Sequence, residues 1–191
     1  LLCVNLAHAA ERFCESLRRV CPPERVDELL EFTGLVETLV IRICPQLPPE
    51  IHQKEPLKVL TNGYPVLHVN KAAFKGELPL LASVRLVEDM RAEEMRKIYT
   101  YNMAQATLAY HGALRGYERI EECIANDKVR AEAEGALSEV GFALSAAFGF
   151  SREDMAEWNR AVMQQTANPA LDDTVQRMGS DPLRKLNRAD R

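Results

Sequence analysis

The stretch that decides the fold runs from residue 96 to residue 110 and reads RKIYTYNMAQATLAY. It is an apolar, helix-favouring run that carries three polar side chains at Lys97, Asn102 and Gln105. At about 100° per residue, Asn102 lies about 140° and Gln105 about 80° round the helix from Lys97, so all three can face one pocket. A desolvated amine can lose its proton near neutrality, and carboxamides can donate to a developing oxyanion. The trio can therefore act on a hydroxyl or a carbonyl group.

The same three residues also allow a purely structural interpretation. Lys97 would extend its amine to solvent along an apolar stem, and the two carboxamides would cap neighbouring backbone groups. Spacing alone leaves both interpretations open.

The composition is that of one globular domain. The chain has 191 residues, of which 47% are apolar and 27% charged, and this is enough for a sizeable core. The net charge is -4 and both signs are interspersed, so there is no broad basic surface for nucleic acid. No run reaches the apolar length that spans a bilayer. Neither nucleic acid nor a membrane is expected as a partner.

The cysteines favour a reducing compartment. They are odd in number and form no Cys-x-x-Cys pair: Cys3, Cys14, Cys21, Cys44 and Cys123. This pattern is typical of reduced thiols, so we expect a cytoplasmic protein without a metal site.

The first residues and the glycines indicate part of a longer chain. Residues 1–6 form an apolar, strand-like run that starts at Leu1 without a basic leader, which we interpret as a fragment rather than a signal peptide. The nine glycines form neither a Gly-x-Gly-x-x-Gly turn nor a phosphate loop. Any nucleotide cofactor would be held mainly by residues outside this chain.

The first half mixes helix and strand signals. The predicted elements are a strand end at residues 1–5, helices at 7–20 and 24–32, a strand at 35–44, and a small hairpin of 57–60 and 66–69 around the Asn62-Gly63 turn signal.

The second half is helical almost throughout. Helices are predicted at residues 93–114, 116–124, 127–148, 151–165 and 169–178. Asp127 and Asn168 are predicted N-caps, Ser151 followed by Asp154 forms a capping pattern, and Pro169 stands at a first helical position. The fold class is therefore mostly α, a multi-helix domain over residues 1–191 with a small β-hairpin element.

Here the sequence resembles a known family. Lys97, Asn102 and Gln105 fall on the Lys-x4-Asn-x2-His signature of the polyol-specific long-chain dehydrogenases, the group of mannitol dehydrogenase and mannitol-1-phosphate 5-dehydrogenase. Gln105 stands where the family has His. Cys3-Val4-Asn5 is similar to the family's Cys-(Asp/Glu)-Asn segment, and residues 40–45 resemble its Val-Asp-Arg-Ile-x-Pro segment with Ile41 in place of the acid.

The end of the chain resembles the phosphate-specific branch of this family. Residues 168–169 and 181–186 look like the terminus of mannitol-1-phosphate dehydrogenases. Arg184 and Lys185, with Arg188 and Arg191, form a cationic cluster that suits a phosphate through charge-assisted hydrogen bonds. The alternative is a solvated basic tail that complements an acidic surface.

The resemblance covers essentially the whole chain and implies the mostly helical C-terminal domain of these enzymes. The expected partner is an N-terminal Rossmann domain, absent here, which would bind NAD. In the implied mechanism Lys97 is the general base, and Asn102 and Asn5 donate hydrogen bonds to the reacting oxygen. Gln105, Arg184 and Lys185 would bind the substrate. No metal is needed.

The expected function is therefore an NAD(P)-dependent polyol dehydrogenase acting on a sugar-alcohol phosphate such as mannitol 1-phosphate, with this fragment inactive alone. Gln105 can still bind a hydroxyl but cannot carry a proton, so any titrating role of the family His is lost. His111 lies about 120° round the helix from Gln105 and does not replace it, whereas His8 is a freer candidate. Two alternatives stay open: a catalytically silent domain that binds a sugar phosphate or a protein, and a related hexuronate reductase.

Overall fold

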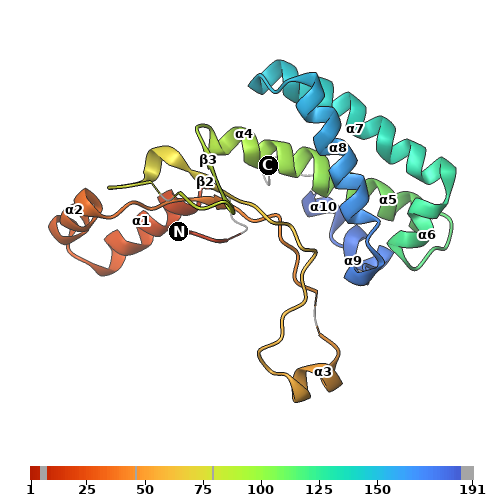
Figure 1. Ribbon diagram of the computed structural model, residues 1–191, viewed down its shortest axis with the longest axis horizontal. Helices are drawn as coiled ribbons and strands as arrows, with labels where there is room; N and C mark the ends of the chain where they lie inside the picture. The colour runs from red at the N-terminus through yellow and green to blue at the C-terminus, as the bar shows by residue number, and fades with distance from the viewer. Residues whose placement is uncertain (5–7, 46, 79, 186–191) are drawn as a thin grey trace. The chain divides into compact units, whose positions relative to one another are not determined.

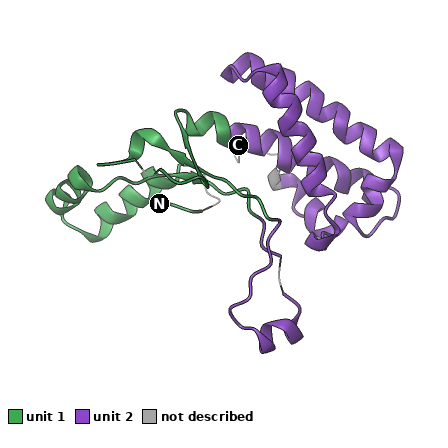
Figure 2. Ribbon diagram, in the orientation of Figure 1, with its two compact units in different colours: residues 1–42, 63–94 green, residues 43–62, 95–191 purple. Residues whose placement is uncertain are grey.

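The computed structural model describes residues 1–4, 8–45, 47–78 and 80–185, with side chains to residue 183. The chain divides into two compact units (Figure 2): residues 1–42 with 63–94, and residues 43–62 with 95–191. The prediction of a mostly helical fold with a small β-element is confirmed. That residues 1–191 form a single domain stays a prediction.

The first unit is built on a three-stranded sheet of order β1-β2-β3. Strand β1 (Thr38–Leu39) pairs antiparallel with β2 (Leu67–Asn70), which pairs in parallel with β3 (Val84–Val87). The predicted hairpin is therefore wrong in its pairing. Residues 57–60 form no strand and expose their apolar side chains, with Leu57 93% exposed, so no sheet covers them.

Two helices accompany this sheet, α1 (Ala9–Val20) and α2 (Pro23–Phe32). Pro22 and Pro23 end the first and begin the second, because proline fits the first turn of a helix but not its interior. The core of the unit is aliphatic and includes Val26, Val69 and Ile41, which is 4% exposed. The family that the sequence resembles has an aspartate where this chain has Ile41. A carboxylate at this buried position would need a cation or a hydrogen-bond donor to compensate its charge.

The second unit begins with an extended arm, residues 43–62, that carries α3 (Pro49–Lys54) at its tip (Figure 1). Asn62 closes the base of this arm. Its backbone N–H donates to the Ile43 carbonyl at 3.1 Å, its side-chain oxygen accepts from the Ile43 N–H at 3.1 Å, and its amide donates to Gln165 at 3.0 Å. Asn62 thus joins the arm to the helices rather than forming a hairpin turn.

The remainder of the second unit is a cluster of helices. In chain order these are α4 (Met90–Lys97), which begins in the first unit, η2 (Ile98–Asn102), α5 (Met103–Ala113), α6 (Ile120–Ala125), α7 (Asp127–Phe148), α8 (Arg152–Thr166), η3 (Pro169–Leu171), α9 (Val175–Gly179) and α10 (Pro182–Lys185). Helix α5 packs on α6, α7 and α9, and α8 packs along α7 (Figure 1). Their shared core includes Leu108, Ile120, Val129 and Val175.

Small residues let these helices approach closely. A Cβ on Gly112 of α5 would lie 2.3 Å from the Cys123 sulfur of α6, so only glycine fits there. Burial, and secondarily the neighbouring Glu122, raises the pKa of the Cys123 thiol. Cys123 therefore packs as a small apolar side chain. All five cysteines are free thiols, and no described helix is both long and apolar enough to span a bilayer.

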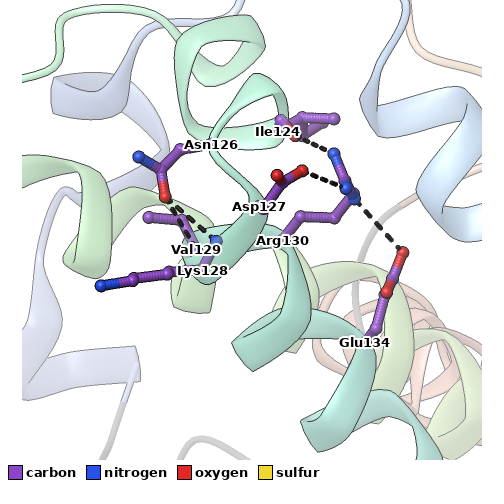
Figure 3. A network of polar contacts seen from close by, with 7 residues as sticks. All are labelled: Ile124, Asn126, Asp127, Lys128, Val129, Arg130 and Glu134. Atoms are coloured by element: carbon purple, nitrogen blue, oxygen red, sulfur yellow. Dashed lines mark hydrogen bonds and ion pairs between the residues drawn. The ribbon is translucent and has the colours of Figure 1, made fainter.

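The start of α7 is fixed by a side-chain cap (Figure 3). The Asn126 side-chain oxygen accepts from the backbone N–H of Lys128 at 3.1 Å and of Val129 at 3.2 Å. Arg130 then ties the first turn back by donating to the Ile124 carbonyl at 3.0 Å and to Asp127 at 2.5 Å. The N-cap is thus one residue earlier than predicted, while the predicted helix boundaries at 127 and 148 are confirmed.

Replacing Asn126 with alanine is expected to destabilise the protein by about 1 kcal/mol, because two N–H groups of the first turn lose their acceptor. Its amide also donates to the Tyr117 hydroxyl at 3.0 Å. Asn126→Asp keeps the acceptor and should recover most of the loss in a urea titration. An equal loss in both variants would assign the effect to the Tyr117 bond instead of the cap.

Candidate active site

The helix predicted at residues 93–114 is present, but a π turn interrupts it. The segment η2 (Ile98–Asn102) joins α4 to α5. Lys97 before it, Asn102 at its end and Met103 after it all keep right-handed helical angles. A π turn closes its hydrogen bonds over five residues instead of four and so inserts one residue into the helix. Such turns are rare and occur frequently at functional sites.

The π turn changes the relative directions of the candidate residues. In an α-helix Asn102 would lie about 140° from Lys97, and the extra residue reduces this to about 40°. Gln105 follows Asn102 by three residues in α5, a spacing that makes neighbours on a helix surface. The backbone therefore aligns Lys97, Asn102 and Gln105 along one side of the helix more closely than the sequence pattern predicted.

The three side chains remain accessible to differing degrees. Asn102 is exposed, and Lys97 and Gln105 are partly buried. The Asn102 carboxamide caps no backbone group of α5, although it precedes the first residue of that helix. Its amide is thus available to a ligand, as the catalytic interpretation requires.

Beside Lys97, the Arg96 side chain points into the helical cluster and is 1% exposed. Its guanidinium lies over the ring of Trp158 at 3.9 Å and over the ring of Phe150 at 4.4 Å, and it donates to Asp154 at 2.6 Å. Asp154 is in the first turn of α8, where Ser151 caps the helix as predicted by accepting from the Asp154 N–H at 3.0 Å. A buried cation is stable here because both rings and a carboxylate compensate its charge.

Thr100 connects the π turn to the same tryptophan. Its hydroxyl donates to the Arg96 carbonyl at 2.6 Å and accepts from the Trp158 indole N–H at 2.8 Å. Thr100 is fully buried, and the ring of the next residue, Tyr101, meets Trp158 edge-on at 5.6 Å. One side of the π turn is therefore anchored on α8.

The other predicted site residues are not placed beside this trio by the structure. Asn5 lies outside the described residues, and Arg184 and Lys185 belong to α10 with side chains that are not described. His8 is exposed at the start of α1 and pairs with Glu11 at 3.5 Å, so it is a surface residue. Among the described residues, no three His, Cys, Asp or Glu side chains are placed to hold a metal ion.

Sequence reasoning missed Thr100, Trp158 and the burial of Arg96. A charged residue at position 96 gives no local sign of burial, and Trp158 is 58 residues away from Thr100. The usable signal was that Trp158 is the single tryptophan of the chain and that its indole N–H needs a partner when buried.

Solved structures share this fold. A substrate-free D-sorbitol dehydrogenase superposes with a TM-score of 0.83 at 23% identity, over 96% of this chain and 40% of that one. The Pseudomonas fluorescens mannitol 2-dehydrogenase in ternary complex with NAD and D-mannitol gives a TM-score of 0.69 at 19% identity, over 92% of this chain and 38% of that one. The chain thus spans about two fifths of the length of these structures.

A family model matches the helical part of the chain from residue 89 onward. The mannitol dehydrogenase C-terminal domain matches residues 89–191, a range that contains the π turn, its anchor on α8 and the three candidate residues. The chain therefore belongs to the mannitol dehydrogenase C-terminal domain family.

Proposed function

We propose that this chain is the substrate-binding and catalytic part of an NAD(P)-dependent polyol dehydrogenase, working within a longer protein in the cytoplasm. The observation that carries the proposal is the alignment of Lys97, Asn102 and Gln105 along one side of a helix through an anchored π turn. Family membership supports it, because a domain of this family with a lysine and two carboxamides in this pattern is equipped for alcohol chemistry.

The chemistry is an alcohol oxidation in which Lys97 is the general base. The neutral Lys97 amine takes the hydroxyl proton while the C–H bond breaks and its hydride leaves, so that a C=O bond forms. In the reverse direction the Lys97 ammonium returns the proton to the forming alkoxide. The Asn102 amide, with Asn5 as a second donor, stabilises negative charge on the reacting oxygen, and each such donor contributes typically about 3–4 kcal/mol to the transition state.

NAD would accept the hydride. The described residues of this chain do not form a binding site for the NAD pyrophosphate. Between the parallel strands β2 and β3, the described residues include a 3-10 turn, and none of them forms the helix whose N-terminus binds a pyrophosphate in dinucleotide sites. The proposed partner is therefore an N-terminal Rossmann domain in the same protein, and this chain supplies the residues that act on the alcohol.

The proposed substrate is a sugar-alcohol phosphate such as mannitol 1-phosphate. Support comes from the sequence of the last residues, where Arg184 and Lys185 precede Arg188 and Arg191 in a chain of net charge -4. Gln105 would bind a further substrate hydroxyl. A related hexuronate reductase would use the same lysine, with the basic cluster holding a carboxylate in place of the phosphate.

The test is a steady-state assay of nicotinamide reduction by the whole protein with mannitol 1-phosphate, mannitol and sorbitol, and of nicotinamide oxidation with a hexuronate. The proposal expects kcat/KM to be highest for the phosphorylated polyol. A preference for unphosphorylated polyols would overturn the phosphate assignment and keep the enzyme class, and activity with the hexuronate alone would overturn both.

Replacing Arg184 and Lys185 together with alanine is expected to raise KM for the polyol phosphate by at least about tenfold, since each lost charge-assisted hydrogen bond to phosphate costs about 1.5–3 kcal/mol. KM for unphosphorylated mannitol should stay within about twofold. Replacing the exposed Arg160 and Lys128 together with alanine, which also removes two positive charges, is the matched control for net charge. Equal increases in KM for both substrates would exclude a phosphate contact.

A further inference from the structure

Thr100 lies in the π turn at a buried position where one side-chain group both donates and accepts a hydrogen bond, as a hydroxyl can. It is 0% exposed, and its hydroxyl uses its proton toward the Arg96 carbonyl at 2.6 Å and a lone pair toward the Trp158 indole at 2.8 Å. A bond from threonine to the carbonyl four residues earlier bends a helix. Thr100 therefore reinforces the irregular backbone at the point where the helix departs from α geometry.

Trp158 holds the turn from the opposite side. Its indole N–H donates to the Thr100 hydroxyl, and its ring faces the Arg96 guanidinium at 3.9 Å. Its ring also forms a T-shaped pair with the ring of Tyr101, with centroids 5.6 Å apart. All three contacts come from one side of the segment 96–102, and Trp158 itself is 8% exposed. The segment is thus fixed in rotation as well as in position relative to α8.

The rotation of this segment sets the directions of the candidate catalytic residues. Lys97 directly follows the anchored Arg96, and Asn102 directly follows the anchored Tyr101. If the turn relaxed to an α-helix, the helix would lose one inserted residue and Asn102 would rotate by about 100° relative to Lys97. The amine and the amide would then no longer reach one substrate oxygen.

We propose that Thr100 and Trp158 are positioning residues that hold the π turn and thereby aim Lys97 and Asn102 at the same substrate oxygen. This rests on the proposed function, because it assigns a role within the same site. In this role neither residue contacts the substrate. They affect kcat by fixing the backbone that carries Lys97 and Asn102, whereas other groups bind the polyol and determine KM.

The test uses steady-state kinetics of the whole protein with three threonine variants. Thr100→Val removes both hydrogen bonds at nearly constant volume, and Thr100→Ser restores the hydroxyl. Thr166→Val is the matched control, because Thr166 is 5% exposed and donates to the Val162 carbonyl at 2.8 Å in α8, the same type of bond away from the π turn. Trp158→Phe is a second route to the same loss, since it keeps an aromatic ring and removes the indole N–H.

Thr100→Val and Trp158→Phe are expected to lower kcat by about 10- to 100-fold, as small misplacements of catalytic groups do, with KM for the polyol within about twofold. Thr100→Ser and Thr166→Val should keep kcat within about twofold of the wild type. An equal fall of kcat in Thr166→Val would overturn the positioning role, because general destabilisation would then explain it.

The Lys97→Ala variant separates the two proposals. Loss of turnover in Lys97→Ala together with wild-type kcat in Thr100→Val would overturn the positioning role and leave the proposed function intact. Wild-type turnover in Lys97→Ala would overturn the proposed function, and the positioning role with it. In the Lys97→Ala background, Thr100→Val should lower the residual turnover by less than it lowers that of the wild type, because only the direction of Asn102 is then left to lose. An equal fall in both backgrounds would contradict a role exerted through Lys97.

Discussion

Lys97→Ala in the whole protein is expected to lower kcat for polyol oxidation by about 10²- to 10⁴-fold, the contribution of a positioned general base. The hydroxyl proton then has no acceptor at the site when hydride leaves, and the barrier rises in both directions. KM for the polyol should change by less than about threefold, because the lysine stabilises the transition state for proton transfer more than it stabilises the bound substrate.

This kcat prediction is checked by initial-rate measurements on wild type and variant at saturating cofactor. Lys128→Ala is the matched control, since Lys128 is an exposed lysine in the first turn of α7. Its kcat should equal that of the wild type. A Lys97→Ala variant with kcat within threefold of the wild type would remove Lys97 from the mechanism.

Arg96→Ala is expected to have the largest effect on stability, about 3–5 kcal/mol. The substitution empties the space between the rings of Trp158 and Phe150, and it leaves Asp154 without the guanidinium that lies 2.6 Å away. A desolvated cation over an aromatic face contributes about 2 kcal/mol, and here there are two such faces. Arg96→Lys should lose an intermediate amount, because an ammonium group cannot stack as a plane between two rings.

The midpoint of urea unfolding measures this loss of stability. Arg152→Ala in α8 is the control, since Arg152 also lies over an aromatic ring, that of Phe142, but at 5.7 Å and at the surface. Its loss should be below about 1 kcal/mol, as for exposed cation–π pairs. Equal midpoints for the wild type and Arg96→Ala would show that the buried guanidinium adds nothing to the fold.

The long helices were predictable because their apolar period is local. In α7 the buried residues Val129, Ala133, Leu137, Gly141 and Leu144 recur every three or four positions, and Asn126 and Gly149 mark its two ends. The sheet was not predictable in the same way. Residues 66–69 carry a strand signal, but β2 pairs with β1, which precedes the arm, and with β3, which begins at Val84. Pairing between such separate segments leaves no local pattern in the sequence.

In the candidate site, too, the local pattern was predictable and the contacts between distant residues were not. The sequence named Lys97, Asn102 and Gln105 on one helix, and the helix is present. The π turn within it depends on Thr100, Trp158 and Arg96, which meet only when α8 packs on the segment 96–102. A regular 100° period contains no information on an inserted residue, so the alignment of Lys97 with Asn102 was visible only in three dimensions.

One measurement tests the central claim most directly: nicotinamide reduction by the whole wild-type protein at saturating mannitol 1-phosphate and at saturating mannitol, beside equilibrium binding of the same two compounds. The account predicts steady turnover with a polyol, and faster turnover with the phosphate. Saturable binding of both compounds by a folded, NAD-binding protein that reduces no nicotinamide would contradict it, and would identify a silent binding domain instead.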